Sequence, residues 1–236
     1  MKFPRPLVKG TLVRRYKRFL ADVELDGGKV VTAHCANPGS MLSVNAPGSE
    51  VWLAETPHPS RKLRYSWELI RVGRALVGIN TQHPNRLVEE AIGNQRIAEL
   101  ACYAALRREV RYGRTSRIDL LLEGAGRPPC YVDVKNVTMK RDLSPSAPAE
   151  FPDSPTARGK KHLDELAGVA RGGGRAVMFF LVNRDDARAF APAADIDPAY
   201  AAGLARAADR GVEVLCYGCR VRLGEIRVDG PLAIRL

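Results

Sequence analysis

The feature that most limits the fold is a change in hydrophobic periodicity near residue 82. Before this point, short runs rich in β-branched and apolar residues alternate with turns, as in β-strands. After it, apolar residues recur at spacings of three and four, as on one face of a helix. A chain of 236 residues is long enough to bury a core in each of two units. We therefore predict two domains, residues 1–82 and 83–236.

The first predicted domain consists of short strands only. Asp26, Gly27 and Gly28 lie between two of these strands and are typical of a hairpin turn. A small closed barrel of the five-stranded OB type fits the length and the spacing of the turns. The expected strands are 7–13, 19–25, 29–34, 50–55, 65–72 and 75–80.

The second predicted domain combines helices with a mixed sheet, in an α/β arrangement. Asn85 is expected to cap a helix whose pattern is interrupted at Gly93 and resumes through residue 106. The run from Ala176 to Val182 is wholly apolar, which is typical of a central buried strand. The other expected elements are a hairpin over 116–135, helices over 156–170 and about 198–210, and closing strands over 212–216, 220–223 and 225–228.

Three ionisable residues on the predicted hairpin form the candidate site. Asp119 interrupts an apolar run, although Asp is disfavoured in strands. Asp133 and Lys135 are two residues apart, so their side chains point to the same face of a strand. If Asp119 faces the same side, two carboxylates and an ammonium converge, and carboxylate oxygens are ligands that Mg²⁺ prefers. The alternative is that all three are ordinary polar residues on a solvent-facing sheet.

The segment that follows the hairpin is expected to complete this site. Residues 143–155 are rich in proline and are predicted to form an ordered loop that covers the site as a lid, because secondary structure resumes directly after it. The next helix carries Arg158, Lys161 and His162 in its first turns. Basic side chains in that position favour contact with phosphate.

The charge of the chain favours a polyanionic partner. The net charge is +11 and the sequence pI is near 9.7, which points first to nucleic acid and second to an acidic membrane surface. An arginine-rich compositional bias is the alternative explanation. In the first domain, basic residues beside the aromatic Tyr16, Phe19 and Tyr65 suit a groove for single-stranded nucleic acid, although a solvated surface over core aromatics is equally consistent with the pattern. These basic residues are Arg14, Arg15, Lys17, Arg18, Arg61, Lys62 and Arg64.

The sequence also predicts a cytoplasmic location. No apolar run approaches the roughly 18 residues of a membrane-spanning helix, and the first ten residues lack the apolar stretch of a signal peptide. The five cysteines are too few and too scattered for a disulfide framework. Cys216 and Cys219 have the spacing of half a zinc site but no second pair, so we expect buried thiols.

Seven segments lie in order along nearly the whole chain: His34–Ser40, Asn85–Glu90, Ser116–Asp119, Tyr131–Lys135, Phe151–Asp153, Arg158–Leu163 and Gly211–Val214. Together they resemble the sugar fermentation stimulation protein A family. The resemblance implies an OB-like barrel fused to a mixed-sheet domain of the restriction-endonuclease-like, or PD-(D/E)xK nuclease-like, type. It also implies DNA binding and a nuclease-type metal site.

The resemblance assigns roles to residues by position. Asp119 matches the first acid of the nuclease motif, Asp133 the second acid and Lys135 the lysine. Glu89 is the better match to the helix glutamate, and the sequence leaves open whether Glu89 or Glu90 faces the site. Two departures are visible: Ile118 stands where the superfamily has proline, and Asp133 stands where glutamate is more frequent.

Two hypotheses follow for the function. In the first, the chain is a phosphodiesterase that acts on DNA and depends on Mg²⁺ or Mn²⁺. Asp119 and Asp133 hold the cation, and Lys135 orients or deprotonates the attacking water or stabilises charge on the phosphate. The side chains that position the DNA backbone without reading its sequence are Arg117, Arg158, Lys161 and His162.

In the second hypothesis, the chain is a non-catalytic DNA-binding regulator of sugar metabolism genes. It rests on the positive charge of the chain and on the family's name. A sugar-acting enzyme has little support, because the sequence shows neither a phosphate-cradling glycine loop nor paired glycosidase carboxylates.

Overall fold

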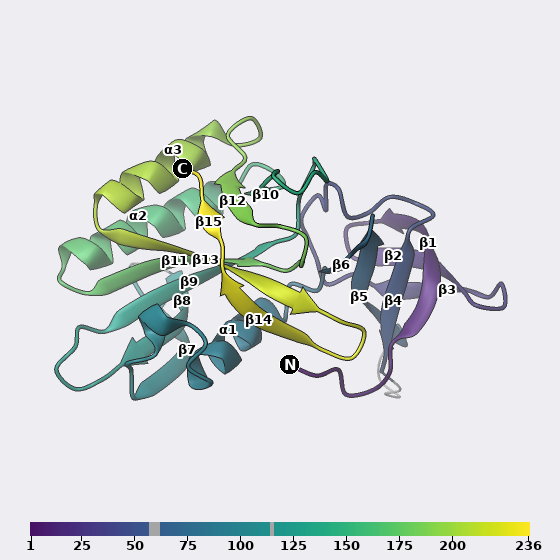
Figure 1. Ribbon diagram of the computed structural model, residues 1–236, viewed down its shortest axis with the longest axis horizontal. Helices are drawn as coiled ribbons and strands as arrows, with labels where there is room; N and C mark the ends of the chain where they lie inside the picture. Colours follow the sequence, from purple (N-terminus) through teal and green to yellow (C-terminus); the bar gives the residue numbers. More distant parts are fainter. Residues whose placement is uncertain (57–61, 114–115) are drawn as a thin grey trace.

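The short strands at the start of the chain close into a barrel (Figure 1). The computed structural model describes residues 1–56, 62–113 and 116–236. Strands β1 to β6 form one sheet in the order β3-β2-β1-β4-β5-β6, and a further pairing of β3 with β5 closes five of them into a ring. The predicted OB-type barrel is confirmed. The strands are β1 (Val8–Tyr16), β2 (Leu20–Leu25), β3 (Val30–His34), β4 (Glu50–Glu55), β5 (Tyr65–Val72) and β6 (Ala75–Gly78).

The turn between β2 and β3 shows why the local sequence specifies this hairpin. Gly27 and Gly28 have φ values of 97° and 82°, in the left-handed region that glycine adopts without steric cost. The turn closes with a hydrogen bond of 2.9 Å from the Leu25 amide to the Lys29 carbonyl. The hairpin predicted at these two glycines is therefore confirmed.

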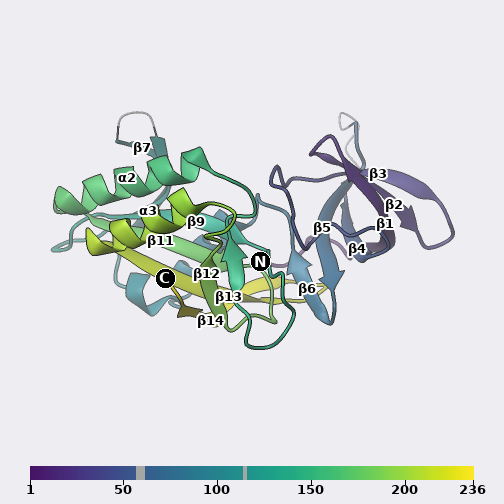
Figure 2. The ribbon, with the colours of Figure 1, turned by 90° about the horizontal axis from the view of Figure 1, so that it is seen from above.

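A mixed six-stranded sheet forms the centre of the second unit, in the order β14-β13-β11-β9-β8-β7. Helices α2 and α3 cover one face of the sheet and α1 covers the other (Figures 1 and 2). The predicted mixed-sheet α/β unit is confirmed. Its elements are α1 (Pro84–Gly93), a 3₁₀ turn (Ala98–Leu100), β7 (Ala105–Tyr112), β8 (Ser116–Glu123), β9 (Cys130–Val137), α2 (Ala157–Arg171), β11 (Arg175–Val182), α3 (Pro198–Asp209), β13 (Val212–Val221) and β14 (Ile226–Pro231).

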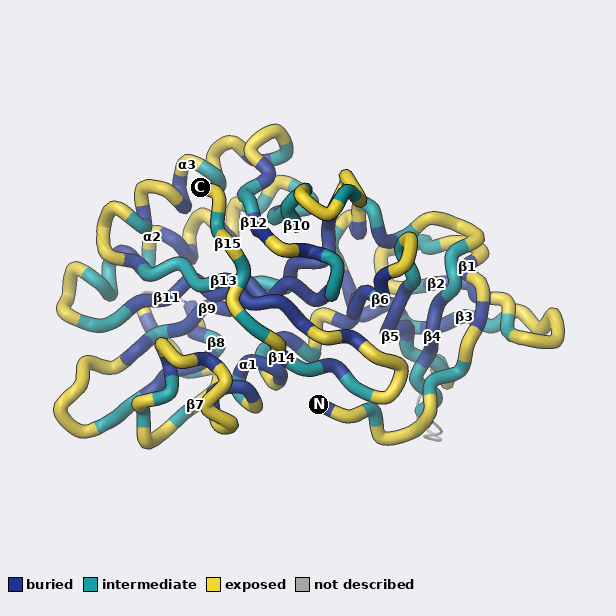
Figure 3. The backbone as a smooth tube through the Cα atoms, viewed as in Figure 1, coloured by how far each residue is buried: buried dark blue, intermediate teal, exposed yellow. Residues whose placement is uncertain are grey.

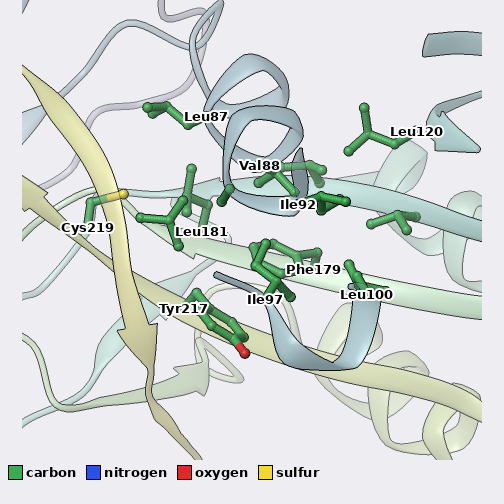
Figure 4. Packing of buried hydrophobic residues seen from close by; sticks show 14 of the residues in the cluster. Leu87, Val88, Ile92, Ile97, Leu100, Leu120, Phe179, Leu181, Tyr217 and Cys219 are labelled. Carbon is green, nitrogen blue, oxygen red and sulfur yellow. The ribbon is translucent and has the colours of Figure 1, made fainter. Parts of the chain in front are cut away.

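The alternation of side chains along β11 divides the core of this unit into two layers. Val177, Phe179 and Leu181 pack beneath α1, as Figure 4 shows for the last two of these residues. Met178 and Phe180 face α2 and α3 on the opposite side. The strand runs parallel to both of its neighbours, β9 and β13, and is buried along nearly its whole length (Figure 3). The predicted central strand is thus confirmed.

The helical pattern predicted to continue beyond Gly93 is wrong. Gln95 has a φ of 55°, and its amide donates to the Ile92 carbonyl at 2.9 Å. The Arg96 amide donates to the Ala91 carbonyl at 2.8 Å, and these two bonds together form a Schellman motif that ends α1. The chain then continues through the 3₁₀ turn into β7, an edge strand that the sequence did not predict.

The proline-rich segment contains more regular structure than predicted. Residues Ala149–Phe151 form β10, which pairs in parallel with β12 (Ala189–Pro192). A third short strand, β15 (Ala233–Ile234), completes this small sheet. Phe151 packs edge-on against Tyr200, with ring centroids 5.3 Å apart. The segment is therefore fixed against the core by β10.

The cysteines are free, and four of the five are buried. Burial raises the pKa of the Cys216 thiol to about 12, and it also raises the pKa of Cys219. The predicted buried thiols at Cys216 and Cys219 are confirmed. Within the described residues, no helix combines the length and the apolar character needed to cross a bilayer.

Phe180 provides a test of the predicted central strand. Its ring is fully buried and stacks on Phe190, with centroids 4.1 Å apart. We expect Phe180→Ala to lower the free energy of unfolding by about 3–5 kcal/mol, because it leaves a cavity that the sheet cannot close. Urea denaturation measures this loss. Leu223→Ala, at a side chain that is 46% exposed, should stay within about 0.5 kcal/mol of the wild type. Equal losses in the two variants would contradict the assignment.

Candidate functional site

The site begins where β8 and β9 separate. Their hydrogen-bonded pairing covers only Leu120 to Leu122 on β8, opposite Val132 to Cys130 on β9. Beyond that point the side chain of Asp119 replaces the backbone ladder, because its Oδ2 accepts a hydrogen bond of 2.7 Å from the Val134 amide. The carboxylate is therefore held at the split between the strands.

Helix α1 supplies a second contact to this carboxylate. Asn85 was predicted to cap α1, but the helix begins at Pro84 and has His83 at its N-cap position. Because Pro84 lacks an amide hydrogen, it suits the first helical position, where that donor has no partner. Asn85 thus lies in the first turn, and its Nδ2 donates to Asp119 Oδ1 at 2.9 Å.

The side chain of Asp133 points to the same face of β9 as that of Tyr131, toward α2. Its Oδ2 is 2.5 Å from His162 Nδ1, and its Oδ1 forms an ion pair with Lys135. The Asp133 residue is only 1% exposed. Val132 and Val134 lie in the opposite core layer, so the predicted alternation of side chains on β9 is confirmed.

The two carboxylates have pKa values shifted in opposite directions. Burial raises the pKa of Asp119, and the negative charge of Asp133 raises it further, against the opposing effect of the Val134 amide. Burial also acts to raise the pKa of Asp133, but the Lys135 ammonium and the hydrogen bond from His162 outweigh it and hold that pKa below its usual value. Asp133 is therefore the carboxylate that is more firmly ionised.

A cavity of about 340 Å³ opens beside Asp119 and Lys135. It lies between the barrel and the second unit, with Asn37, Pro38 and Gly39 on the barrel side. Three carboxylate side chains and one lysine belong to its wall, so acidic side chains predominate there. A cation bound at this wall would reduce its repulsion of a phosphate. The ionisable lining residues are Asp119, Lys135, Glu150 and Asp153.

The barrel side of the cavity is fastened by two residues whose roles the sequence did not reveal. Arg15 Nη2 donates to the carbonyls of Asn37 and Gly39, at 2.8 Å each. Asp153 Oδ2 accepts a hydrogen bond of 2.8 Å from the Met41 amide and thereby ties the barrel to the segment after β10. Asp153 belongs to a segment that carries the family resemblance, and Met41 directly follows another such segment. The resemblance was the only sequence signal for this contact.

The arrangement fits a hard divalent cation that takes part of its shell from water. In the described ranges, no group of three or more histidine, cysteine or acidic residues is arranged as a metal site. Asp119 and Asp133 nevertheless supply two carboxylates, and Asp133 Oδ1 is a buried oxygen that accepts no well-aligned hydrogen bond from the described residues and is compensated by the ion pair with Lys135. One or two carboxylates, with water and substrate phosphate, are the usual shell of Mg²⁺.

Helix α1 does not bring its glutamates into this cluster. Glu89 lies one turn beyond Asn85, and its carboxylate is 3.5 Å from Arg108 on β7. Glu90 pairs with the amino group of Met1 at 2.8 Å. The position assigned to a helix glutamate by resemblance is thus one turn away from the residue that contacts Asp119.

The basic residues on α2 divide into a buried and an exposed set. His162 is buried against Asp133, so it does not lie on the phosphate-facing surface that the sequence predicted. Arg158 is exposed, and its Nε lies 3.4 Å from His162 Nε2. Lys161 is exposed and is 3.8 Å from Glu165. On β8, Arg117 is also exposed, and in the strand register it lies opposite Arg111 of β7.

The basic residues of the barrel also differ in their surroundings. Arg14 pairs with Asp22 at 2.8 Å and lies over the Tyr16 ring. Lys17 and Arg18 are exposed in the turn between β1 and β2. Elsewhere on the barrel, Arg64 forms an ion pair with Glu55, Lys62 is exposed, Arg15 holds the turn at the cavity, and Arg61 lies outside the described residues.

The arrangement of a barrel followed by a mixed-sheet unit agrees with two family profiles. The profile described as "SfsA N-terminal OB domain" matches residues 13–79, and that described as "Sugar fermentation stimulation protein RE domain" matches residues 82–225. The chain belongs to the sugar fermentation stimulation protein family.

Relatives in this family match the chain over nearly its whole length. A sugar fermentation stimulation protein homologue of Rhodospirillum rubrum is 60% identical over 228 residues, covering 94% of this chain and 93% of the relative. A homologue of Paramagnetospirillum magneticum is 54% identical, covering 100% of this chain and 98% of the relative. The structure of Pyrococcus furiosus SfsA in complex with Ca²⁺ superposes with a TM-score of 0.89 at 27% identity, covering 100% of this chain and 98% of that chain.

The stability of the site should depend on pH through Asp133. The folded state lowers its pKa below the ordinary value of 3.8, so its ionisation stabilises the fold above that value and this contribution is lost as the pH falls below it. We expect Asp133→Asn to cost about 3 kcal/mol at pH 7, because Lys135 loses its counter-ion, and clearly less at pH 3.

Urea unfolding at the two pH values measures this difference. Asp164→Asn, at an exposed carboxylate of α2, serves as the control and should be nearly neutral at both. A cost of Asp133→Asn that stays constant between pH 7 and pH 3 would show that the carboxylate is not stabilised in its ionised form.

Proposed function

We propose that this protein binds DNA and cleaves phosphodiester bonds at the Asp119–Asp133–Lys135 cluster with the help of a divalent cation, Mg²⁺ or Mn²⁺. The observation that carries the proposal is the position of the cluster. Two carboxylates of unequal pKa and one lysine lie at the split between β8 and β9, beside a cavity that the barrel also lines. A reaction centre at this position would lie next to the unit that we propose binds nucleic acid.

Each residue of the cluster would have a distinct role in the reaction. Asp119 and Asp133 would hold the cation, which when bound would polarise the scissile phosphate and lower the pKa of a water molecule. Asn85 and the Val134 amide keep Asp119 in place, since each donates a hydrogen bond to it. Lys135 would stabilise the negative charge that develops on the phosphate.

The OB barrel supports the DNA part of the proposal. Lys17 and Arg18 are exposed at the end of the β1–β2 hairpin, and the neighbouring Phe19 side chain is 46% exposed. Basic side chains that neutralise phosphates, beside an aromatic ring on which a base can stack, are the elements of a single-strand groove. The net charge of +11 adds a long-range attraction for any nucleic acid.

The relative from Pyrococcus furiosus adds support for the cation. Its structure was determined in complex with Ca²⁺, and Ca²⁺ and Mg²⁺ both select oxygen ligands. The carboxylates of Asp119 and Asp133 are oxygen donors of this class. We infer that a divalent cation is the cofactor of the present chain and that Mg²⁺ or Mn²⁺ is the ion used in catalysis.

One observation favours a second candidate, a non-catalytic DNA-binding regulator. The charge of Asp133 is already balanced by Lys135 and by a hydrogen bond from His162. A cluster that is neutralised internally can persist in a fold for its stability alone, without catalysis. In that case DNA binding would be independent of metal and unaffected by Asp119→Ala.

The catalytic proposal is tested by nuclease assays on single-stranded DNA, double-stranded DNA and RNA with Mg²⁺ or Mn²⁺. We expect Asp119→Ala and Asp133→Ala each to lower the cleavage rate at least about a hundredfold, the scale expected for loss of a charge-stabilising group. Glu89→Gln should leave the rate unchanged, because Glu89 contacts Arg108 instead of the cluster. Cleavage that survives Asp133→Ala, or no cleavage of any substrate, would reject the nuclease and favour the regulator.

The DNA part has a separate test in the salt dependence of binding. Each phosphate contact contributes about 0.7 to the slope of log K against log salt concentration for single-stranded DNA. We therefore expect the double variant Lys17→Ala/Arg18→Ala to reduce that slope by about 1.4 on single-stranded DNA, measured by fluorescence anisotropy between low and moderate salt. Arg206→Ala, on the exposed side of α3, is the matched control. An unchanged slope in the double variant would place the DNA elsewhere on the molecule.

A further inference from the structure

The orientation of Asp133 is fixed by a chain of contacts that runs from the surface of α2. Arg158 Nε donates to His162 Nε2 at 3.4 Å, so Nε2 acts as an acceptor. In a neutral imidazole the other nitrogen then carries the proton, which places it on Nδ1. His162 Nδ1 lies 2.5 Å from Asp133 Oδ2. The histidine therefore donates to Oδ2 and leaves Oδ1 directed toward Lys135.

Asp133 Oδ1 is incompletely satisfied in this arrangement. It is buried, and no described residue gives it a hydrogen bond of proper geometry. Its compensation is the charge of the Lys135 ammonium, which forms an ion pair with it. A buried carboxylate oxygen requires either hydrogen-bond donors or a cation. In this structure the lysine supplies that cation.

The Lys135 ammonium has fewer hydrogen-bond acceptors beside it than it has donors. An ammonium has three donors, yet among the described residues Asp133 is the one acceptor beside it. Its other polar neighbour, His162 Nδ1 at 3.4 Å, already donates its proton to Asp133. The Lys135 side chain is 14% exposed and borders the 340 Å³ cavity, so it has space into which it can move.

We propose that the Lys135 ammonium holds the place of the divalent cation at Asp133 and moves into the cavity when the cation binds. This inference rests on the function proposed above. The cation and the ammonium cannot both lie at Oδ1, because like charges at such a separation repel strongly. Once displaced, the ammonium borders the cavity, where a substrate phosphate offers it oxygen acceptors. The lysine thus becomes available to substrate only after the metal has bound.

Mn²⁺ binding to the full chain without DNA tests this order, by electron paramagnetic resonance or calorimetry. Lys135→Met removes the competing charge, and we expect it to bind Mn²⁺ at least about tenfold more tightly than the wild type. Lys135→Gln should show the same change and guards against misfolding of the Met variant. Lys160→Met removes an exposed lysine of α2 and should leave the affinity unchanged.

The outcomes separate this inference from the proposed function. If the wild type binds Mn²⁺ and neither Lys135 variant binds it more tightly, the displacement is rejected while the metal site stands. If neither the wild type nor the variants bind Mn²⁺, the metal site and the displacement are both rejected. A second readout is the ¹⁵N resonance of the Lys135 ammonium. It should shift on addition of Mg²⁺, and an unchanged resonance at saturating Mg²⁺ would overturn the proposal.

Discussion

The burial of Asp133 is the constraint on which the rest of the site depends. A carboxylate that is 1% exposed in a sheet needs compensation from its neighbours, and it receives a hydrogen bond from His162 on α2 and an ion pair from Lys135 on its own strand. These contacts fix the position of α2 relative to β9. They also explain why the pKa of Asp133 is lowered in spite of burial, while that of Asp119 is raised. One carboxylate is thereby kept ionised beside another that holds its proton more readily.

The junction between the two units forms where β8 and β9 separate. Because β8 and β9 stop pairing beyond Leu120, the sheet opens toward the barrel, and the cavity forms at that opening. The barrel is held against it by Asp153, which accepts from the Met41 amide, and by Gly78, whose amide donates to the Asn183 carbonyl at 2.9 Å. The barrel turn Asn37–Gly39 and Asp119 therefore line the same cavity.

Much of the fold and part of the site could be predicted, because their signals are local. The period-two alternation on β9 places Asp133 beside Lys135, and the apolar run of β11 marks a central strand. The remainder depends on tertiary contacts. Whether Asn85 or Glu89 meets Asp119 is decided by where α1 lies against β8, and His162 is turned inward to a contact with Asp133 that lies 29 residues away in the sequence. Strand β7 was missed because most of its residues are exposed, and the end of α1 was misplaced because Gln95 adopts a conformation more typical of glycine.

The most direct test of the account is an anomalous-diffraction measurement on crystals soaked in Mn²⁺. The account predicts an anomalous peak between the carboxylates of Asp119 and Asp133, with the Lys135 ammonium no longer paired with Asp133. The absence of a peak there, with Lys135 still paired with Asp133, would contradict the account. A peak beside Glu89 in place of Asp119 would contradict it as well.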